Sequence, residues 1–367
     1  MATGWPMKTT YADGDVYSAS DVNDITGTIN LLGSSIAYAA GKNKIINGDF
    51  YFNQRNFTST TTSSYGFDRW RYEFSTGTNT YSAQTFTPGT APVAGYEGKS
   101  FAQMAITGQS ATSAYNILGQ RVEDVRTFAG QTVTLSFWAK ASSGTPKIGL
   151  EITQVFGSGG SPSAFVSTPL GSITTSTSWV RYSKTIAVPS ISGKTIGTDA
   201  NSSFIEANLW LSAGSDHNTR ASSIGINNST FQIWGVQLEA GSTATAFQTA
   251  TGTIQGELAA CQRYFYAITQ SNGGAIGNGG YFSTTQYQLS INFPVVMRTA
   301  VSFTRSAATA IGVYRNLGAV VSTAIALDSA SVQGCDINVT TPTSVTGHAG
   351  FARFDGSNNY LWFSAEL

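Results

Sequence analysis

From Lys44 onward, apolar and polar residues alternate at every second position over many short stretches of the chain. The clearest are QTVTLSFWAKA (131–141), PKIGLEITQVF (146–156) and SFIEANLWL (203–211). A period of two places apolar side chains on one face of a strand and polar side chains on the other, which predicts half-buried antiparallel strands. About ten such strands fit between residues 44 and 240, with turn residues between them, and this arrangement predicts a jelly-roll β-sandwich.

The segment FQIWGVQLE (231–239) is the predicted last strand of this sandwich, and AGSTATAFQTATG (240–252) is predicted to be a linker that leaves it. TIQGELAACQRYFYA (253–267) predicts a short helix or tight turn, and the strands that follow predict a second, smaller β-sandwich. The chain is therefore expected to be all-β. Its predicted parts are an N-terminal attachment segment at 1–40, a jelly roll at 41–250 and a C-terminal domain at 251–367.

Residues 18–39 carry the strongest helical pattern of the chain. Apolar residues recur there at spacings of three and four, which is the spacing of a coiled-coil seam. The predicted seam consists of Val22, Ile25, Ile29, Leu32 and Ile36. A helix this short is marginal alone in water, and isoleucine-rich seams favour three or more strands, so we expect a homotrimer. The alternative is one amphipathic helix packed on its own domain.

Charged residues make up only 11% of the chain, and 20 basic residues balance 20 acidic ones. A chain without a basic field has no means of collecting nucleic acid or anionic lipid. No run of 18 apolar residues is present, so membrane insertion is not expected, and the first residues contain no apolar signal-peptide segment. Few charges and no net charge suit a subunit of a large assembly better than a free monomer.

Several stretches, taken in order, resemble bacteriophage tail fibres and receptor-binding proteins. They are GDVYSASDVNDI, NKIINGDFYFNQR, YGFDRWRY, TLSFWAKA, SWVRYSKTIAVP, IWGVQLEAGSTATAF, ELAACQRYFYA and FPVVMRTAVSF. The resemblance implies a viral protein located in the phage tail of the virion. It implies that the N-terminal segment attaches to a tail or baseplate protein, and that the chain recognises a host-surface receptor, with a glycan as the expected partner.

The jelly-roll part is also similar to carbohydrate-binding modules of the β-sandwich type. Such modules often hold a structural calcium near the first strand, with an aspartate in the last strand. Asn47, Gly48 and Asp49 match the first part of that pattern, but Trp234 and Gly235 stand where the aspartate is expected. The expected metal and cofactor content of this chain is therefore none.

Two strands of the predicted jelly roll place tryptophan on their polar side. Trp138 lies there in one strand, and Trp210 lies beside Glu206 and Asn208 in the other. A flat ring can stack on the C–H face of a sugar while neighbouring polar groups bind its hydroxyls, so these four residues form a candidate glycan site. Alternatively, the two rings pack against a loop or a neighbouring subunit.

Catalysis is not expected. Glycoside hydrolysis needs two carboxylates across one bond, and the carboxylates of the jelly roll form no recognisable pair. The candidates are Asp68, Glu73, Glu97, Glu123, Asp124, Glu151 and Glu206. A depolymerising tailspike and a free carbohydrate-binding module or lectin remain as alternatives.

The C-terminal domain is the expected receptor-binding tip, because the N-terminal segment is expected to point at the particle. Its stretches SNGGAIGNGGYF (271–282) and FDGSNNYLW (354–362) combine Gly, Asn, Ser and aromatic residues, a mixture typical of recognition loops. The candidate contacts are Tyr281, Phe282, Asn358, Asn359 and Tyr360. The alternative is that the glycines serve tight turns and the aromatic residues fill a core.

Overall fold

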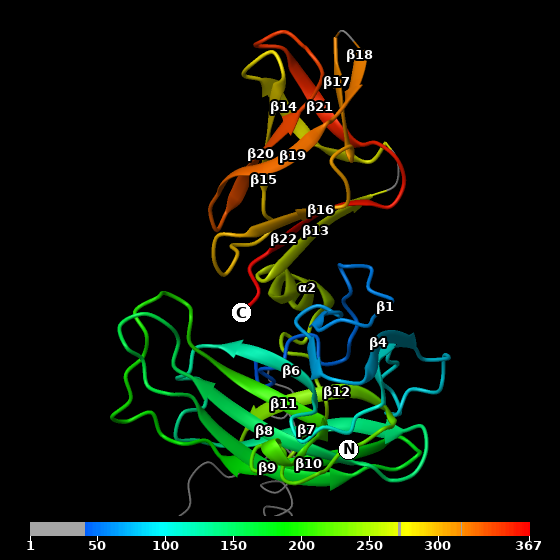
Figure 1. Ribbon diagram of the computed structural model, residues 1–367, viewed down its shortest axis with the longest axis vertical. Coiled ribbons are helices and arrows are strands. Elements are labelled where there is room, and N and C mark those ends of the chain that lie inside the picture. The colour runs from blue at the N-terminus through cyan, green and yellow to red at the C-terminus, as the bar shows by residue number, and fades with distance from the viewer. Residues whose placement is uncertain (1–40, 271–272, 317) are drawn as a thin grey trace, which may run out of the picture.

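The computed structural model describes residues 41–270, 273–316 and 318–367. The predicted coiled-coil segment, with the seam Val22, Ile25, Ile29, Leu32 and Ile36, lies outside the described residues. The described part is almost entirely β-structure, as the alternating pattern predicts, and its strands form four antiparallel sheets (Figure 1). None of its helices is long and apolar enough to cross a membrane.

The first domain is a sandwich of two six-stranded sheets. Sheet A has the order β1 (Ser59–Thr60), β4 (Thr78–Thr85), β5 (Ser100–Thr107), β12 (Thr230–Ala240), β7 (Thr132–Ala141), β10 (Val180–Ala187). Sheet B has the order β2 (Ser64–Tyr65), β3 (Arg71–Ser75), β6 (Tyr115–Glu123), β11 (Phe204–Ala213), β8 (Lys147–Val155), β9 (Val166–Thr174). Among β5 to β12, the first strand neighbours the last and the second neighbours the seventh, which is jelly-roll topology.

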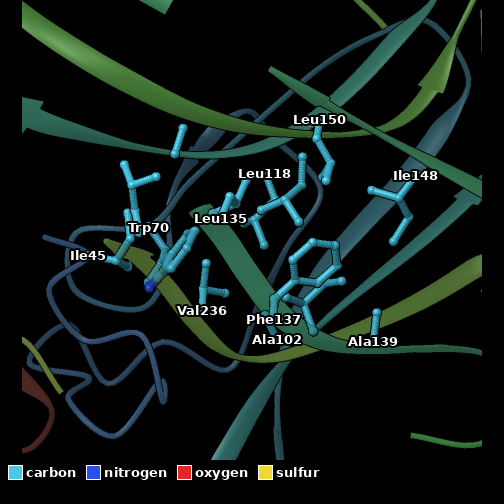
Figure 2. Packing of buried hydrophobic residues seen from close by; sticks show 14 of the residues in the cluster. Ile45, Trp70, Ala102, Leu118, Leu135, Phe137, Ala139, Ile148, Leu150 and Val236 are labelled. Atoms are coloured by element: carbon cyan, nitrogen blue, oxygen red, sulfur yellow. The ribbon is translucent and has the colours of Figure 1, made fainter. Parts of the chain in front are cut away.

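The core of the jelly roll lies between the two sheets, as Figure 2 shows for part of the cluster. The inward positions are those that the alternation predicts. They are Val133, Leu135, Phe137 and Ala139 on β7, and Ile205, Ala207, Leu209 and Leu211 on β11. Trp70 lies fully buried at one end of this core, and its indole N–H donates to the Asn47 carbonyl oxygen at 2.8 Å.

The second domain begins with helix α2 (Ile254–Gln262), whose N-cap Thr253 accepts a hydrogen bond from the Gly256 N–H. A three-stranded sheet has the order β13 (Phe265–Gln270), β22 (Asn359–Ser364), β16 (Ser302–Arg305). A seven-stranded sheet has the order β18 (Gly318–Val321), β17 (Ile311–Arg315), β21 (Ala349–Phe354), β14 (Ala275–Tyr281), β15 (Gln286–Asn292), β20 (Gly334–Thr340), β19 (Ala324–Ala330). Their core is a cluster of its own, separate from that of the jelly roll.

The segment predicted as an exit linker is instead part of the jelly roll. Phe247 is 8% exposed and packs on the rings of Trp138 and Trp234, which face outward from sheet A. The backbone N–H of Thr245 donates to Glu239 Oε1 at 2.9 Å, which fixes the turn after β12. The prediction was wrong because it ignored the outward-facing indole rings, whose burial favours a covering segment.

The two domains meet around α2 and the end of β22, which lie between the jelly roll and the seven-stranded sheet in Figure 1. Residues 365–367 extend from β22 into this junction, where Glu366 pairs with Arg55 and Arg69. The guanidinium of Arg263 binds both carboxylate oxygens of Glu123, at 2.8 and 2.9 Å. The buried pairs of Glu366 and the more exposed Arg263–Glu123 pair hold the domains together through ionic and hydrogen-bonded contacts.

Candidate functional site

The outward face of sheet B carries polar residues in rows across neighbouring strands. One row joins Arg71 on β3, Gly119 on β6, Asn208 on β11 and Glu151 on β8. The next row toward the end of β11 joins Glu73, Ile117, Trp210 and Gly149. Side chains in one row stand about 5 Å from their neighbours, so both rows form one continuous surface.

Residues 214–229, between β11 and β12, fold over one side of this surface. They fit closely because Gly149 has no side chain, and a Cβ built there would lie 2.3 Å from the Ala221 carbonyl oxygen. Arg220 in this loop donates to both carboxylate oxygens of Glu151, at 2.7 and 3.0 Å. The loop therefore turns part of a flat sheet face into one wall of a pocket.

The resulting pocket has a volume of about 330 Å³. It is lined by Arg71, Glu73, Tyr115, Ile117, Gly119, Glu206, Asn208, Trp210, His217 and Arg220. Gly119 on β6, between β3 and β11, forms the floor of the pocket. A Cβ built there would lie 2.5 Å from Asn208 Oδ1. A side chain at this position would displace Asn208 and fill the pocket. We call this site the sheet-B pocket.

Each carboxylate in and below the sheet-B pocket is paired with an arginine. Besides the Glu151–Arg220 pair, Arg121 Nε lies 3.0 Å from Glu206 Oε1, and Arg71 pairs with Glu73 at 2.5 Å. The surface therefore presents fixed donors and acceptors without a large net charge. Such an arrangement suits hydrogen bonds to a neutral polyhydroxyl ligand, since the pairs hold each group in place.

Trp210 has a different role from the one that the sequence predicts. It does lie on the outward side of β11, but it is only 1% exposed. Its indole N–H donates to Glu151 Oε2 at 2.9 Å, and its ring is flanked by Arg220 and His217, with 5.1 Å to the guanidinium carbon and 5.4 Å between ring centroids. A ring covered in this way supports the pocket and does not offer a face to a sugar.

Trp138 lies on sheet A and therefore apart from the other three candidate glycan residues. It is 8% exposed and packs against Trp234 and Phe247 in an aromatic cluster on the outward side of that sheet. Arg181 lies 4.7 Å above its ring. The structure thus brings together Glu206, Asn208 and Trp210 but separates Trp138 from them, because the alternation of one strand does not reveal which sheet the strand joins.

The structure also does not bring the five predicted receptor contacts together at one site. Tyr281 is a correction, because its ring is 2% exposed in the core of the second domain and its hydroxyl lies 2.8 Å from Thr341 Oγ1. Phe282, the next residue, is 55% exposed. The others, Asn358, Asn359 and Tyr360, line a different cavity beside the first domain.

The Asn47–Asp49 segment is occupied by contacts within the fold. The Asn47 side-chain amide donates to the carbonyl oxygens of Phe52 and Asp68, at 2.9 and 3.0 Å. Asp49 Oδ2 accepts a hydrogen bond from the Tyr96 hydroxyl at 2.8 Å, and burial raises the pKa of this carboxyl group. The described residues contain no group of three or more His, Cys, Asp or Glu side chains that could hold a metal ion.

Sequence reasoning missed the residues of the sheet-B pocket that come from other segments. Tyr115 lies on β6, which pairs with β11, and Arg71 lies on β3, which pairs with β6; no local pattern in the sequence encodes these pairings. His217 and Arg220 lie in a long polar segment between two strands, and its length was the available signal, since long loops in compact domains are often functional.

No protein-family model matches this chain, and no curated protein matches it. Among solved structures, the chain is similar to the enzymatically active domain of tailspike protein 4 of bacteriophage CBA120, with 15% identity and a TM-score of 0.32. The match covers 54% of this chain and 21% of the tailspike chain, so only about a fifth of that protein is represented.

Two further similar structures have names that refer to sugar binding. The CBM22-2 xylan-binding domain from Paenibacillus barcinonensis has 17% identity and a TM-score of 0.30, over 50% of this chain and 98% of that domain. A putative sugar-binding protein from Bacteroides thetaiotaomicron has 15% identity and a TM-score of 0.32, over 54% of this chain and 100% of its own.

Proposed function

We propose that this chain is a glycan-binding subunit of a phage tail fibre. In this proposal the N-terminal segment joins three copies and attaches them to a tail or baseplate protein, and the described domains contact a glycan on the host surface. The fibre part rests on the ordered set of sequence stretches that resemble tail fibres. The glycan part rests on the sheet-B pocket.

The observation that carries glycan binding is the convergence of Glu206, Asn208 and Tyr115 on one pocket above Gly119. A volume of about 330 Å³ lies at the lower end of the range for small-ligand sites, and suits one or two sugar rings. The arginine partners fix the carboxylates as acceptors for sugar hydroxyls. Tyr115, which is partly exposed, supplies the ring that Trp210 does not.

We propose binding rather than catalysis for this pocket. A retaining or inverting glycosidase needs one carboxyl group that keeps a proton and a second that stays ionised. Glu206 is ion-paired with Arg121 and Glu73 with Arg71, so each carboxyl group among the described lining residues of the pocket is bound to an arginine. Neither carboxyl group is therefore free to approach a glycosidic oxygen without breaking its ion pair.

The C-terminal domain is the second candidate for the receptor contact, as the sequence predicts. The specific observation in its favour is that Asn358, Asn359 and Tyr360 line one cavity. Phe282 is an exposed ring elsewhere on the same domain.

The test is binding of the full chain to immobilised bacterial lipopolysaccharides and capsular polysaccharides. We expect Tyr115→Ala to weaken binding at least tenfold, which corresponds to about 1.4 kcal/mol. Asn278→Ala, which changes an exposed amide on the second domain, is the matched control and should have no effect. Full binding by the Tyr115 variant would move the receptor contact to the C-terminal domain, and release of reducing ends from a bound polysaccharide would refute the non-catalytic assignment.

A further inference from the structure

One face of the three-stranded sheet in the second domain is turned toward the jelly roll. Strand register places Trp362 of β22 beside Ala267 of β13 and Thr304 of β16, and places Tyr360 beside Thr269. Leu361 and Phe363, which alternate with these residues, are fully buried in the core. The tyrosine and the tryptophan therefore point out of the second domain, toward the junction.

The rings of Tyr360 and Trp362 are stacked, with centroids 4.1 Å apart and an angle of 20° between their planes. Each ring thus covers one face of the other, and Trp362 is also in edge-to-face contact with Phe265, with centroids 5.7 Å apart. Cavities of about 510 and about 490 Å³ adjoin this pair, and Trp362 lines both of them. Arg55 and Asn56 of the jelly roll line both cavities as well. We call the two cavities together the junction groove.

The polar groups of the junction groove include several that the fold does not use. Asn56, Gln270 and Asn358 are exposed residues that line the larger cavity, and their side-chain amides have no hydrogen-bond partner within the described part of the chain. The Trp362 indole N–H is buried and also has no partner among the described residues. A buried donor without a partner costs free energy, which a bound acceptor would recover.

Arg55 is the one charged side chain among the described residues that line the larger cavity, and it is already neutralised. Arg55 lies 3.5 Å from Asp68 and 3.2 Å from Glu366, and its guanidinium stacks 3.5 Å above the ring of Phe265. The larger cavity therefore offers amides and aromatic rings but no free charge. This combination favours a neutral ligand with many hydroxyl groups over an acidic or basic one.

We propose that the junction groove is a second ligand site, which binds a neutral oligosaccharide. The apolar face of one sugar ring lies on the free face of Tyr360, while the amides of Gln270, Asn56 and Asn358 bind hydroxyl groups. The site takes residues from both domains, so the bound sugar chain bridges them. The inference rests on the second candidate of the proposed function, whose cavity it shares and whose ligand class it names, and it does not depend on the sheet-B pocket.

The test is titration of the full chain with soluble hexasaccharides, followed by calorimetry. The probes are neutral hexamers of glucose, galactose, mannose and N-acetylglucosamine, with hexamers of galacturonic acid as the charged comparison. We expect at least one neutral probe to bind, and its affinity to fall at least tenfold in Tyr360→Ala and in Gln270→Ala. Asn278→Ala and Tyr115→Ala should leave that affinity unchanged.

A second readout reports directly on the junction groove. With 5-fluorotryptophan in place of tryptophan, the fluorine signal that disappears in Trp362→Phe should shift when the neutral probe binds. The exposed Gln270→Ala change keeps the test valid if the Tyr360 variant does not fold. The proposal is overturned if no neutral probe binds, if only the galacturonic acid hexamers bind, or if binding is lost only in Tyr115→Ala.

Discussion

The guanidinium carbon of Arg69, in the jelly roll, lies 3.3 Å from the centre of the Tyr264 ring in the second domain. The Arg69 side chain is 1% exposed, and the carboxylate of Glu366 pairs with it from the end of β22. One buried cation thus contacts both the segment that enters the second domain and the segment that follows its last described strand. This cluster therefore joins the two domains through a buried cation, an aromatic ring and a carboxylate.

Removal of the Glu366 carboxylate from this cluster should lower the stability of the second domain strongly. Glu366→Gln leaves the buried charge of Arg69 without its nearest carboxylate, and breaking a buried ion pair from one side costs about 3–5 kcal/mol. We expect the free energy of unfolding of the second domain to fall by about 3 kcal/mol in a urea titration.

The matched control is the exposed pair of Asp124 and Arg126, whose side chains are 48% and 62% exposed. Arg126→Ala should change stability by less than about 0.5 kcal/mol, since solvent screens such pairs. Equal effects of the two variants would show that the Glu366 contact does not hold the junction.

Asp68 predicts a pH dependence of stability. Burial is the largest influence and raises the pKa of its carboxyl group to about 6, against the attraction of Arg55 and hydrogen bonds from Gln54. A raised folded-state pKa means that this contribution to stability is fully present below the unfolded pKa of 3.8 and is lost as pH rises through 6.

The measurement is the difference in unfolding free energy between the wild type and Asp68→Asn at each pH. This difference should fall on the order of 2 kcal/mol between pH 4 and 7. Asp49 and Glu257, whose pKa values burial also raises, are common to both proteins and cancel in the comparison. A difference that rises with pH would contradict the buried, poorly compensated state of Asp68.

One added methyl group at position 119 is expected to close the sheet-B pocket. Because a Cβ there lies 2.5 Å from Asn208 Oδ1, Gly119→Ala should rotate Asn208 away from Glu151 and reduce polysaccharide binding about tenfold. Gly280→Ala is the control, since the nearest atom to its added Cβ is 3.7 Å away. Unchanged binding in the Gly119 variant, measured on the same immobilised polysaccharides, would place the ligand elsewhere.

Trp138 should matter for stability and not for binding. Its ring is buried against Trp234 and Phe247, and truncation of a buried aromatic residue costs about 3–5 kcal/mol. Trp138→Ala should therefore lower the melting temperature and leave polysaccharide affinity intact below the transition. The reverse result, lost affinity at an unchanged melting temperature, would restore Trp138 as a ligand contact.

Assembly is the remaining prediction, and it concerns the N-terminal segment. Light scattering of the full chain should give about three times the 38.7 kDa monomer mass. Ile25→Asp combined with Ile29→Asp should give the monomer, because two charges in a seam of this length prevent its burial. Both described domains should stay folded in that variant, as each has its own core.

The sequence predicts the individual strands of this protein better than it predicts which strands lie beside one another. The alternation in 203–211 correctly places Ile205, Ala207 and Leu209 inward, since side-chain direction is a property of the strand itself. The positions of Trp138 and Trp210 on different sheets follow from the pairing of distant strands. The sequence contains no local signal for that pairing. The prediction of one glycan site from these four residues was therefore wrong, because Trp138 lies on the other sheet.

Burial on the outward side of a strand was equally hard to predict. Trp210 and Glu151 are covered by residues 214–229, and Trp138 by residues near Phe247, although all three point away from the core. Alternation gives the direction of a side chain but not what lies above it. Tyr281 shows the opposite error, because a residue in a glycine-rich stretch was expected at the surface and instead ends a strand with its ring in the core.

The order of the strands in the three-stranded sheet has a consequence for how the protein is made. Strand β22, the middle strand of that sheet, comes after β13 and β16 in the chain. During synthesis β13 and β16 therefore emerge with the edges that face β22 unpaired, while all strands of the jelly roll are already available. We expect the jelly roll to fold first on the ribosome, and the nascent second domain to be exposed to misassociation and chaperone binding until residue 364 emerges.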